Sequence, residues 1–475
     1  MLTYYVKNSK MFMCKNCIMK EAMVSFVLAQ IQKLKGDMNM ANKVEPRTLP
    51  GFMELNPNDQ VKFNQMKETI QRTYERFGFL PLDTPVIELS EVLLAKAGGE
   101  TEKQIYRFTK GDSDLSLRFD LTVPLAKYVA QYYNDLAFPF KRYQIGKVYR
   151  GEKAQKGRYR EFYQCDIDII GDGELSTIND AQIPSIIYNT FKELGFDNFT
   201  ICINNRKILN GLFGSLGLAD MAADILRVID KIEKIGEDAV KSELEVMGIN
   251  AEAIESIINF VSIDGTVDEK ISALNNLGVE DEMFHIGVEE LSDVVRYIRV
   301  LGVPEQYFMI DLKIARGLDY YTGTVYETFL NDYRKIGSVC SGGRFDNLAE
   351  YYTDKKLPGV GISIGLTRLF YQLTQMDAVK ADKESISEVL IIPMDSDVDC
   401  CLQVASALRA AGINTDIYFE GGKMKKKMKY ADKWRIPFVI IIGEEERATG
   451  LYTLKNMKTG EQLKLPLEDT IRTIK

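Results

Sequence analysis

The sequence contains a single histidine, His285, among its 475 residues. One imidazole cannot build a metal site of several histidines, and it leaves almost no room for a Ser-His-Asp triad or a Cys-His dyad. Cysteine is scarce as well: there are seven, and Cys400 and Cys401 are adjacent, a poor geometry for a mutual disulfide. We therefore expect a reducing, cytoplasmic location, no metal site built by the protein alone, and chemistry that uses no imidazole from the chain.

Long apolar runs and an excess of positive charge are also missing. The longest apolar runs, such as residues 438–442, are far shorter than the roughly 20 residues of a membrane-spanning helix, so we expect no membrane partner. Sixty basic residues against 68 acidic ones give a net charge of −8, so any nucleic-acid binding must come from a local patch. The length and the 45% apolar content predict a globular chain of two or three domains.

Two common nucleotide-binding signatures are absent. No Gly-x4-Gly-Lys-Ser/Thr occurs, and Gly359-Val-Gly-Ile-Ser-Ile-Gly365 has the wrong spacing for a dinucleotide fingerprint. The sequence instead places arginines on predicted strands and at a helix start. Each alone would suit an ordinary surface position, but guanidinium groups grip phosphate as a fork, so the set favours a triphosphate. The set is Arg150, Arg158, Arg316, Arg344 and Arg368.

Local patterns predict the elements that carry these residues. Asn56 as N-cap, Pro57 at the first helical position and apolar residues at helical spacing up to Phe77 predict a long amphipathic helix. The alternation over 117–123 predicts a strand with one packed and one charged face, followed by a helix that Pro124 opens. Residues 140–171 predict a hairpin, with Gln164 and Asp168 on one face of its second strand.

The remaining segments of the chain differ in their sequence patterns. Residues 205–300 have helical patterning and predict an inserted helical module, and residues 359–365 predict a strand that runs into a helix with Arg368 in its first turn. Residues 389–442 alternate as βαβαβ and predict a small parallel-sheet domain. The first 45 residues predict a poorly ordered extension, and its Cys14-x-x-Cys17 pair is only half of a zinc site.

Three ordered motifs carry a resemblance to a known family. Tyr149-Arg150-Gly-Glu152 and the following residues to Asp168 resemble motif 2 of class II aminoacyl-tRNA synthetases, and 361–369 resembles motif 3. Arg316-Gly-Leu-Asp-Tyr-Tyr-Thr-Gly-Thr-Val resembles the peptide characteristic of histidyl-tRNA synthetases, and Pro85 fits motif 1 of the dimer interface. The resemblance implies an α+β catalytic domain over 48–376 with a mixed, mostly antiparallel sheet, the helical insertion at about 206–300, an α/β anticodon-binding domain over 388–475, and 1–47 as extension.

The resemblance also implies roles for individual residues. Arg316 and Arg150 would be catalytic, and Arg150 would share the ATP site with Glu152, Arg158 and Arg368. The histidine contacts would be Asp120, Leu121, Thr122, Gln164, Asp168, Tyr320 and Tyr321. Phe345 stands where the family often has tyrosine, which puts any hydroxyl contact there in doubt.

The chemistry of aminoacylation supports these residue types independently. The carboxylate of an amino acid has a pKa near 3.5, so it is a nucleophile at neutral pH without a general base. Arginines and Mg²⁺ stabilise the charge that gathers on the attacked phosphate. Carboxylates pair with an ammonium and with a ring N–H, and a pocket of such groups rejects substrates that leave them unpaired.

The resemblance thus implies the activity of that family, ligation of L-histidine to tRNA(His) with ATP and Mg²⁺, and a homodimer. The alternative is a catalytically inactive paralogue with a regulatory or RNA-binding role, which histidine-dependent pyrophosphate exchange would distinguish. In the tail, 423–429 holds five lysines in seven residues. Such a run is usually a solvated helix face, but in an acidic protein it is also the patch that would bind tRNA phosphates, and the candidates are Lys425, Lys426 and Lys427.

Overall fold

The computed structural model describes residues 44–95, 100–153, 157–229, 231–314, 321–347, 349–379, 384–395 and 398–475. Arg316, Tyr320, the Cys14/Cys17 pair and most of the predicted N-terminal extension lie outside the described residues. The chain divides into two units, Met1–Leu49 and Pro50–Lys475. All helices and strands of the described residues belong to the second unit.

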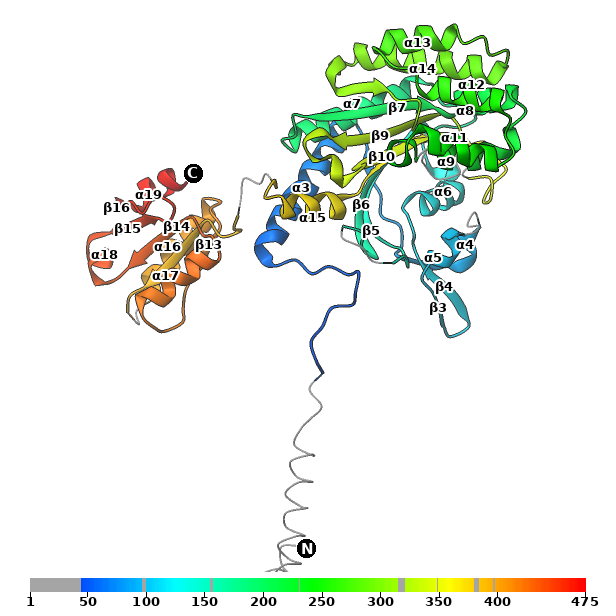
Figure 1. Cartoon of the computed structure of the whole chain (residues 1–475). Coiled ribbons are helices and arrows are strands. Elements are labelled where there is room, and N and C mark those ends of the chain that lie inside the picture. Colours follow the sequence, from blue (N-terminus) through cyan, green and yellow to red (C-terminus); the bar gives the residue numbers. More distant parts are fainter. Residues whose placement is uncertain are drawn as a thin grey trace, which may run out of the picture. The chain divides into compact units, whose positions relative to one another are not determined.

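A mixed, mostly antiparallel sheet is the centre of the larger part of the chain (Figure 1). Its inner pairings are all antiparallel, and only the two edge strands pair in parallel, β1 with β5 and β8 with β7. The predicted fold class is therefore confirmed for this sheet. In spatial order the strands are β1 (Leu80–Pro81), β5 (Phe140–Tyr149), β6 (Glu161–Ile170), β11 (Gly359–Ile364), β10 (Cys340–Phe345), β9 (Thr324–Leu330), β7 (Phe199–Asn205) and β8 (Phe308–Ile310).

The hairpin of β5 and β6 separates apolar from polar residues between the two faces of this sheet. Cys165, Ile167 and Ile169 are fully buried in the main core, which also contains apolar residues of the helix α3 (Pro57–Arg76). The alternate residues Gln164, Asp166 and Asp168 point to the opposite face, because side chains in a strand alternate. The predicted hairpin is confirmed, and its polar face is the floor of a pocket.

The helices around the large sheet form where the sequence supplies caps and an apolar stripe. In α3 the Asn56 side chain accepts a hydrogen bond from the backbone N–H of Asp59 at 3.0 Å, as the N-cap pattern predicts. Its buried stripe, Phe63, Met66 and Ile70, faces the core. The helix α7 (Ile178–Glu193) shares this core, and α15 (Leu366–Gln375) follows β11 as predicted.

The predicted helical pattern of 205–300 is confirmed. These helices pack on the sheet through α14, which contacts β7, and α13, which contacts β8 (Figure 1). They are α8 (Arg206–Ser215), α9 (Ala222–Ile229), α10 (Ile232–Ile235), α11 (Glu237–Val246), α12 (Ala251–Val261), α13 (Val267–Asn275) and α14 (Glu282–Val300). Among the described residues, no helix combines the length and the hydropathy that a membrane span needs.

The strand predicted over 117–123 is wrong. Strand β4 (Ser113–Leu117) ends where that strand was expected to begin, and the helix α6 (Thr122–Gln131) starts before Pro124. Arg118 and Asp120, expected on the charged face, are buried along with Leu121, and both make hydrogen bonds inside the protein. Strand β4 forms a small sheet with β2 (Ile87–Leu89) and β3 (Arg107–Lys110), next to α4 (Ser90–Leu94) and α5 (Glu100–Gln104).

The tail contains the predicted βαβαβ series and then departs from it. Strands β13, β12 and β14 are parallel, but two antiparallel strands extend the sheet, so it is mixed rather than purely parallel. The added hairpin follows α18, which Gly450 ends in a left-handed conformation. The elements are β12 (Val389–Pro393), α16 (Asp399–Ala410), β13 (Thr415–Ile417), α17 (Met424–Lys433), β14 (Phe438–Ile442), α18 (Glu444–Thr449), β15 (Leu451–Asn456), β16 (Gln462–Pro466) and α19 (Leu467–Ile474).

Candidate active site

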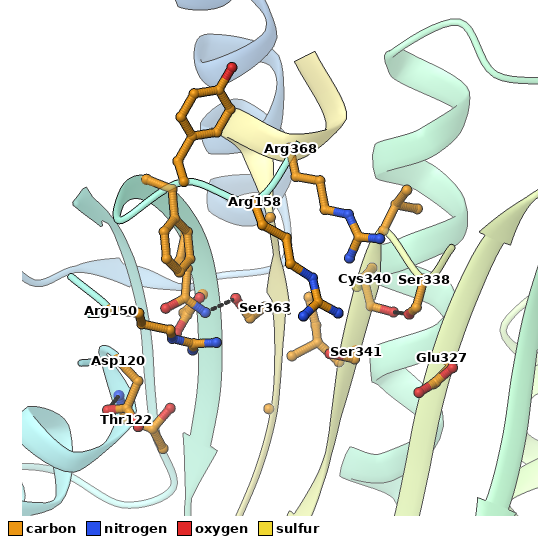
Figure 2. Close-up of a pocket in the computed structure, with 18 of the residues that line it drawn as sticks. Asp120, Thr122, Arg150, Arg158, Glu327, Ser338, Cys340, Ser341, Ser363 and Arg368 are labelled. Carbon is orange, nitrogen blue, oxygen red and sulfur yellow. Dashed lines mark hydrogen bonds between the residues drawn. The ribbon is translucent and has the colours of Figure 1, made fainter. Parts of the chain in front are cut away.

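A pocket of about 440 Å³ opens on the polar face of the large sheet (Figure 2). Its floor comes from β6, β11 and β10, and its walls come from the start of α6, the loop after β5 and the start of α15. Of the predicted site residues, the pocket lining includes Asp120, Thr122, Arg150, Glu152, Arg158, Gln164, Asp168, Tyr321 and Arg368. Residues from five separate stretches of sequence therefore meet in one cavity.

Asp120 lies at the start of α6, where its Oδ1 accepts hydrogen bonds from the backbone N–H groups of Thr122 at 3.1 Å and Val123 at 2.9 Å. These N–H groups have no partner inside a first helical turn, so a carboxylate before the helix satisfies them. Burial raises the pKa of Asp120, while the two backbone N–H groups and Arg150 oppose the rise. The helix start thus holds a buried carboxylate at one end of the pocket.

Asp168 lies on β6 and forms an ion pair with Arg142 of β5, whose Nη2 is 2.6 Å from Asp168 Oδ2. The two residues face each other directly in the strand register, and Arg142 also donates to the carbonyl of Leu121 at 3.0 Å. Burial raises the pKa of Asp168 to about 7, and Arg142 opposes the rise. A Cβ on Gly361 would lie 2.2 Å from Asp168 Oδ1, so the glycine in this motif makes room for the carboxylate.

Asp166 is a third buried acid of the pocket, and it was not among the predicted site residues. Burial raises its pKa to about 6, while Arg142 and a hydrogen bond with Ser363 oppose the rise. Ser363 on β11 also accepts a hydrogen bond from Gln164 Nε2 at 2.7 Å. Asp166 alternates with Gln164 and Asp168 by the period of two, so this periodicity in the sequence was a signal that could have identified it.

Three arginines line the pocket, Arg150 beside Asp120 and the other two, Arg158 and Arg368, farther along (Figure 2). The Arg150 guanidinium carbon lies 4.4 Å from the ring centre of Phe119 and 5.2 Å from that of Phe162, and its Nε donates to the Phe119 carbonyl at 3.3 Å. Two rings and a carbonyl therefore fix its direction. Arg368 donates to the carbonyl of Ile336, and Arg158 is about half exposed, with Nη1 3.7 Å from Glu152 Oε2.

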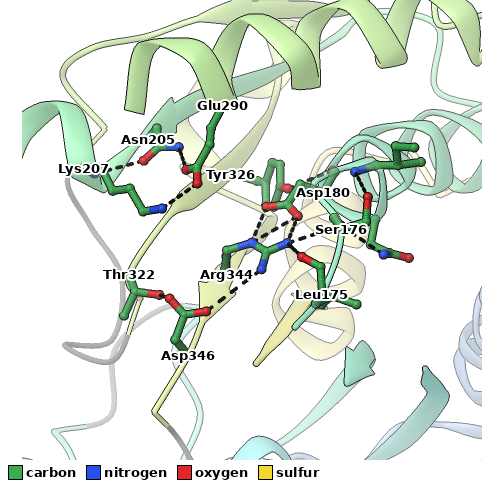
Figure 3. Close-up of polar contacts among 12 residues, drawn as sticks. Leu175, Ser176, Asp180, Asn205, Lys207, Glu290, Thr322, Tyr326, Arg344 and Asp346 are labelled. Carbon is green, nitrogen blue, oxygen red and sulfur yellow. Dashed lines mark hydrogen bonds and ion pairs between the residues drawn. The ribbon is translucent and has the colours of Figure 1, made fainter. Parts of the chain in front are cut away.

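Two predicted residues have different environments from those the patterns suggested, and two residues at the site were not predicted. Arg344, one of the arginines expected to favour a triphosphate, does not line the pocket: its Nε donates to the buried Asp180 carboxylate at 3.0 Å, and its Nη2 donates to the Leu175 carbonyl at 2.9 Å (Figure 3). The Leu121 side chain is fully buried and is not part of the lining, so this residue contributes only its carbonyl. Arg142 and Glu327 were missed, and Glu327 lines the pocket from β9.

The tail lysines differ from one another. Lys425 and Lys426 are exposed on α17, whereas Lys427 is half-buried and donates from Nζ to the Pro393 carbonyl at the end of β12 at 2.7 Å. Pro85 is exposed in the loop between β1 and β2.

The antiparallel sheet, the pocket with acids and arginines, and a separate mixed-sheet tail define a class II aminoacyl-tRNA synthetase. Family models support this class: one described as "Histidyl-tRNA synthetase" matches residues 51–369, and one described as "Anticodon binding domain" matches residues 388–475. The chain belongs to the histidyl-tRNA synthetase family.

Individual relatives agree with this assignment. The chain is 60% identical over 433 residues to "Histidine--tRNA ligase" of Clostridium tetani (strain Massachusetts / E88), which covers 91% of this chain and 98% of that protein. The crystal structure of histidyl-tRNA synthetase from Nostoc sp. PCC 7120 is similar with a TM-score of 0.85 and 42% identity, over 91% of this chain and 99% of that one. An ATP phosphoribosyltransferase regulatory subunit/histidyl-tRNA synthetase from Bacillus halodurans C shares the fold at 20% identity, with a TM-score of 0.68 over 81% of this chain and 97% of that one.

Proposed function

We propose that this chain is a histidine–tRNA ligase that activates L-histidine with ATP and transfers the histidyl group to the 3′ end of tRNA(His). The observation that supports this most is the polarity of one pocket. Buried carboxylates of Asp120, Asp166 and Asp168 gather at one part of it beside Arg150, and Arg158 and Arg368 line another. The first suits a substrate rich in N–H donors, and the second suits phosphates.

In this proposal the acidic part of the pocket binds histidine. Asp120, Thr122 and Gln164 accept hydrogen bonds from its ammonium group, and Asp168 accepts one from an imidazole N–H. Gln164 Oε1 is buried and has no hydrogen-bond partner among the described residues, as expected for an acceptor reserved for a substrate. Tyr320 and Tyr321 complete the imidazole pocket.

The arginine part binds ATP. Arg150, held between Phe119 and Phe162, contacts the α-phosphate and the histidine carboxylate, while Arg158 and Arg368 contact the outer phosphates and Glu152 the adenine. Mg²⁺ keeps several waters and binds mainly through substrate phosphates with one or two carboxylates, and Glu327 is a carboxylate in the lining that fits this demand. When bound, Mg²⁺ would supply charge neutralisation between phosphates.

Adenylate formation then needs no general base, because the histidine carboxylate is already ionised. A carboxylate oxygen of histidine attacks the α-phosphorus, the bond to pyrophosphate breaks, and histidyl-adenylate forms. A terminal ribose hydroxyl of tRNA next attacks the acyl carbon, the bond to the phosphate oxygen breaks, and AMP leaves with the hydroxyl proton on its phosphate. The fixed guanidinium of Arg150 stabilises the negative charge on the attacked phosphate, and we propose the same role for Arg316.

Two further proposals concern assembly and tRNA. Exposed apolar residues on β1, β2 and β3 and in the loop before β2, together with the exposed Pro85, favour a homodimer through this surface; they are Leu80, Val86, Ile87, Leu89 and Phe108. In the tail, the exposed lysines of α17 bind phosphates of the anticodon stem. We place the enzyme in the cytoplasm.

Histidine-dependent exchange of radiolabelled pyrophosphate into ATP tests the proposal directly. We expect exchange with L-histidine and none without it, followed by charging of tRNA(His). Replacement of Arg316 by alanine should lower exchange by about 100-fold or more, as for a lost charge-stabilising donor, without changing the melting temperature. An intact chain that shows no histidine-dependent exchange would instead support the inactive paralogue.

A further inference from the structure

Gln164, Ser363 and Asp166 form a short polar chain across two neighbouring strands of the pocket floor. Ser363 on β11 pairs directly with Asp166 on β6 in the antiparallel register, so their side chains stand side by side on one face. Gln164 is two residues away on the same face of β6, and its Nε2 lies 2.7 Å from Ser363 Oγ. All three residues line the pocket.

The protons available to Gln164, Ser363 and Asp166 decide which way the Gln164 amide faces. An ionised carboxylate only accepts hydrogen bonds, whereas a hydroxyl has one proton to donate. Asp166 is the carboxylate beside Ser363 in the strand register, and its pKa is lowered by a hydrogen bond from Ser363, so the serine gives its proton to Asp166 and can only accept from Gln164. The group that faces Ser363 must then be the amide NH₂ of Gln164, because the amide oxygen has no proton to offer.

This orientation leaves Gln164 Oε1 as the free end of the amide. That oxygen is buried and has no hydrogen-bond partner among the described residues. A rotated amide would present an NH₂ group to the substrate instead, and a donor placed against an ammonium cannot form a hydrogen bond with it.

We propose that Asp166 and Ser363 are positioning residues that hold the Gln164 amide with its oxygen toward the ammonium group of the amino acid. The proposal rests on the role given to Gln164 in the proposed function and adds two residues that act through it. Neither residue needs to touch the substrate. Their effect is on recognition of the amino group and not on the binding of ATP.

The test uses the full-length enzyme and pyrophosphate exchange, with KM measured separately for histidine and for ATP. Ser363→Ala keeps the Asp166 charge but frees the amide, and Asp166→Asn lets the new amide donate to Ser363, which turns the serine proton toward Gln164. Each variant should raise the KM for histidine about ten-fold or more, the effect of one lost hydrogen bond to a charged group, with the KM for ATP unchanged. Ser363→Thr keeps the hydroxyl and should stay close to the parent.

Two inhibitors identify the group that is recognised. Histidinol keeps the amino group, and imidazole lacks it. Inhibition by histidinol should weaken in Ser363→Ala by the same factor as the KM for histidine, and inhibition by imidazole should not change. Equal weakening of both would mean that the variant disturbs the whole pocket, and this would overturn the proposal.

A compensating change provides the rescue. In the double variant Asp166→Asn with Gln164→Glu, the carboxylate at 164 accepts from Ser363 with one oxygen and from the ammonium with the other, and the net charge of the pocket equals that of the parent. The KM for histidine should return toward the parent value. An unchanged KM in Ser363→Ala, or no rescue in the double variant, would refute the positioning role. If the parent enzyme itself showed no histidine-dependent exchange, the proposed function would fail, and the positioning role would fail with it.

Discussion

Replacement of two lysines on α17 separates tRNA binding from stability in the tail. Lys425 and Lys426 are exposed, but Lys427 is tied to the Pro393 carbonyl, so a variant that removes all three would mix two effects. The informative variant is Lys425→Ala with Lys426→Ala. If each lysine neutralises one phosphate, the slope of log affinity against log salt should become shallower by about 1.4–1.8, since each contact contributes roughly 0.7–0.9.

That change in slope means that the ratio of parent to variant affinity should fall about 7- to 12-fold between 50 and 200 mM salt. Filter binding of tRNA(His) over this range measures it, and pyrophosphate exchange, which needs no tRNA, should not change. Lys458→Ala with Lys475→Ala removes the same charge from exposed positions elsewhere in the tail and is the matched control. Lys427→Met should lower stability without changing the slope. An unchanged slope in the α17 double variant would show that the lysines form only a solvated face.

Three further predictions concern the catalytic part. Arg344→Ala leaves the fully buried Asp180 without its partner, so the free energy of unfolding from urea titration should drop by about 3–5 kcal/mol; a loss below about 1 kcal/mol would contradict a paired buried charge. Burial raises the pKa of Asp168 to about 7, so its ionisation favours the unfolded state, and the stability that it contributes should decline as pH rises from about 4 to 7. The melting temperature of the parent minus that of Asp168→Asn should therefore decrease over that range. A constant difference would refute the raised pKa. Ile87→Asp should halve the mass measured by light scattering if the exposed surface of β2 is the dimer interface, whereas Val300→Asp, at an exposed position on α14, should not.

Elements with strong local signals were predictable. The cap at Asn56, the apolar stripe of α3 and the alternation of β6 can be identified from residues close in sequence, because helix and strand periodicities are local properties. Residues 117–123 show the limit of this reasoning. Their alternation suits a strand, but Asp120 instead satisfies the first N–H groups of α6 and turns inward, which no local pattern distinguishes.

The polar pairings of the pocket were not predictable, because they depend on strand register. Arg142 meets Asp168 only because β5 and β6 pair with that register, and Ser363 meets Asp166 only because β11 lies next to β6. Arg344 was grouped with the phosphate-binding arginines because its residue type matches theirs. Its burial against Asp180 of α7 appears only once the sheet and that helix are packed.

The sequence by itself determined the chemistry that this protein has available: one histidine, arginines in ordered motifs, and carboxylates spaced along a strand, which together favour adenylate formation without a protein imidazole. Tertiary structure alone decided which of these side chains share a pocket and in which orientation. The physical reason is that a hydrogen bond or an ion pair depends on distances of a few ångströms between segments far apart in sequence. Those distances are set by the packing of the whole sheet.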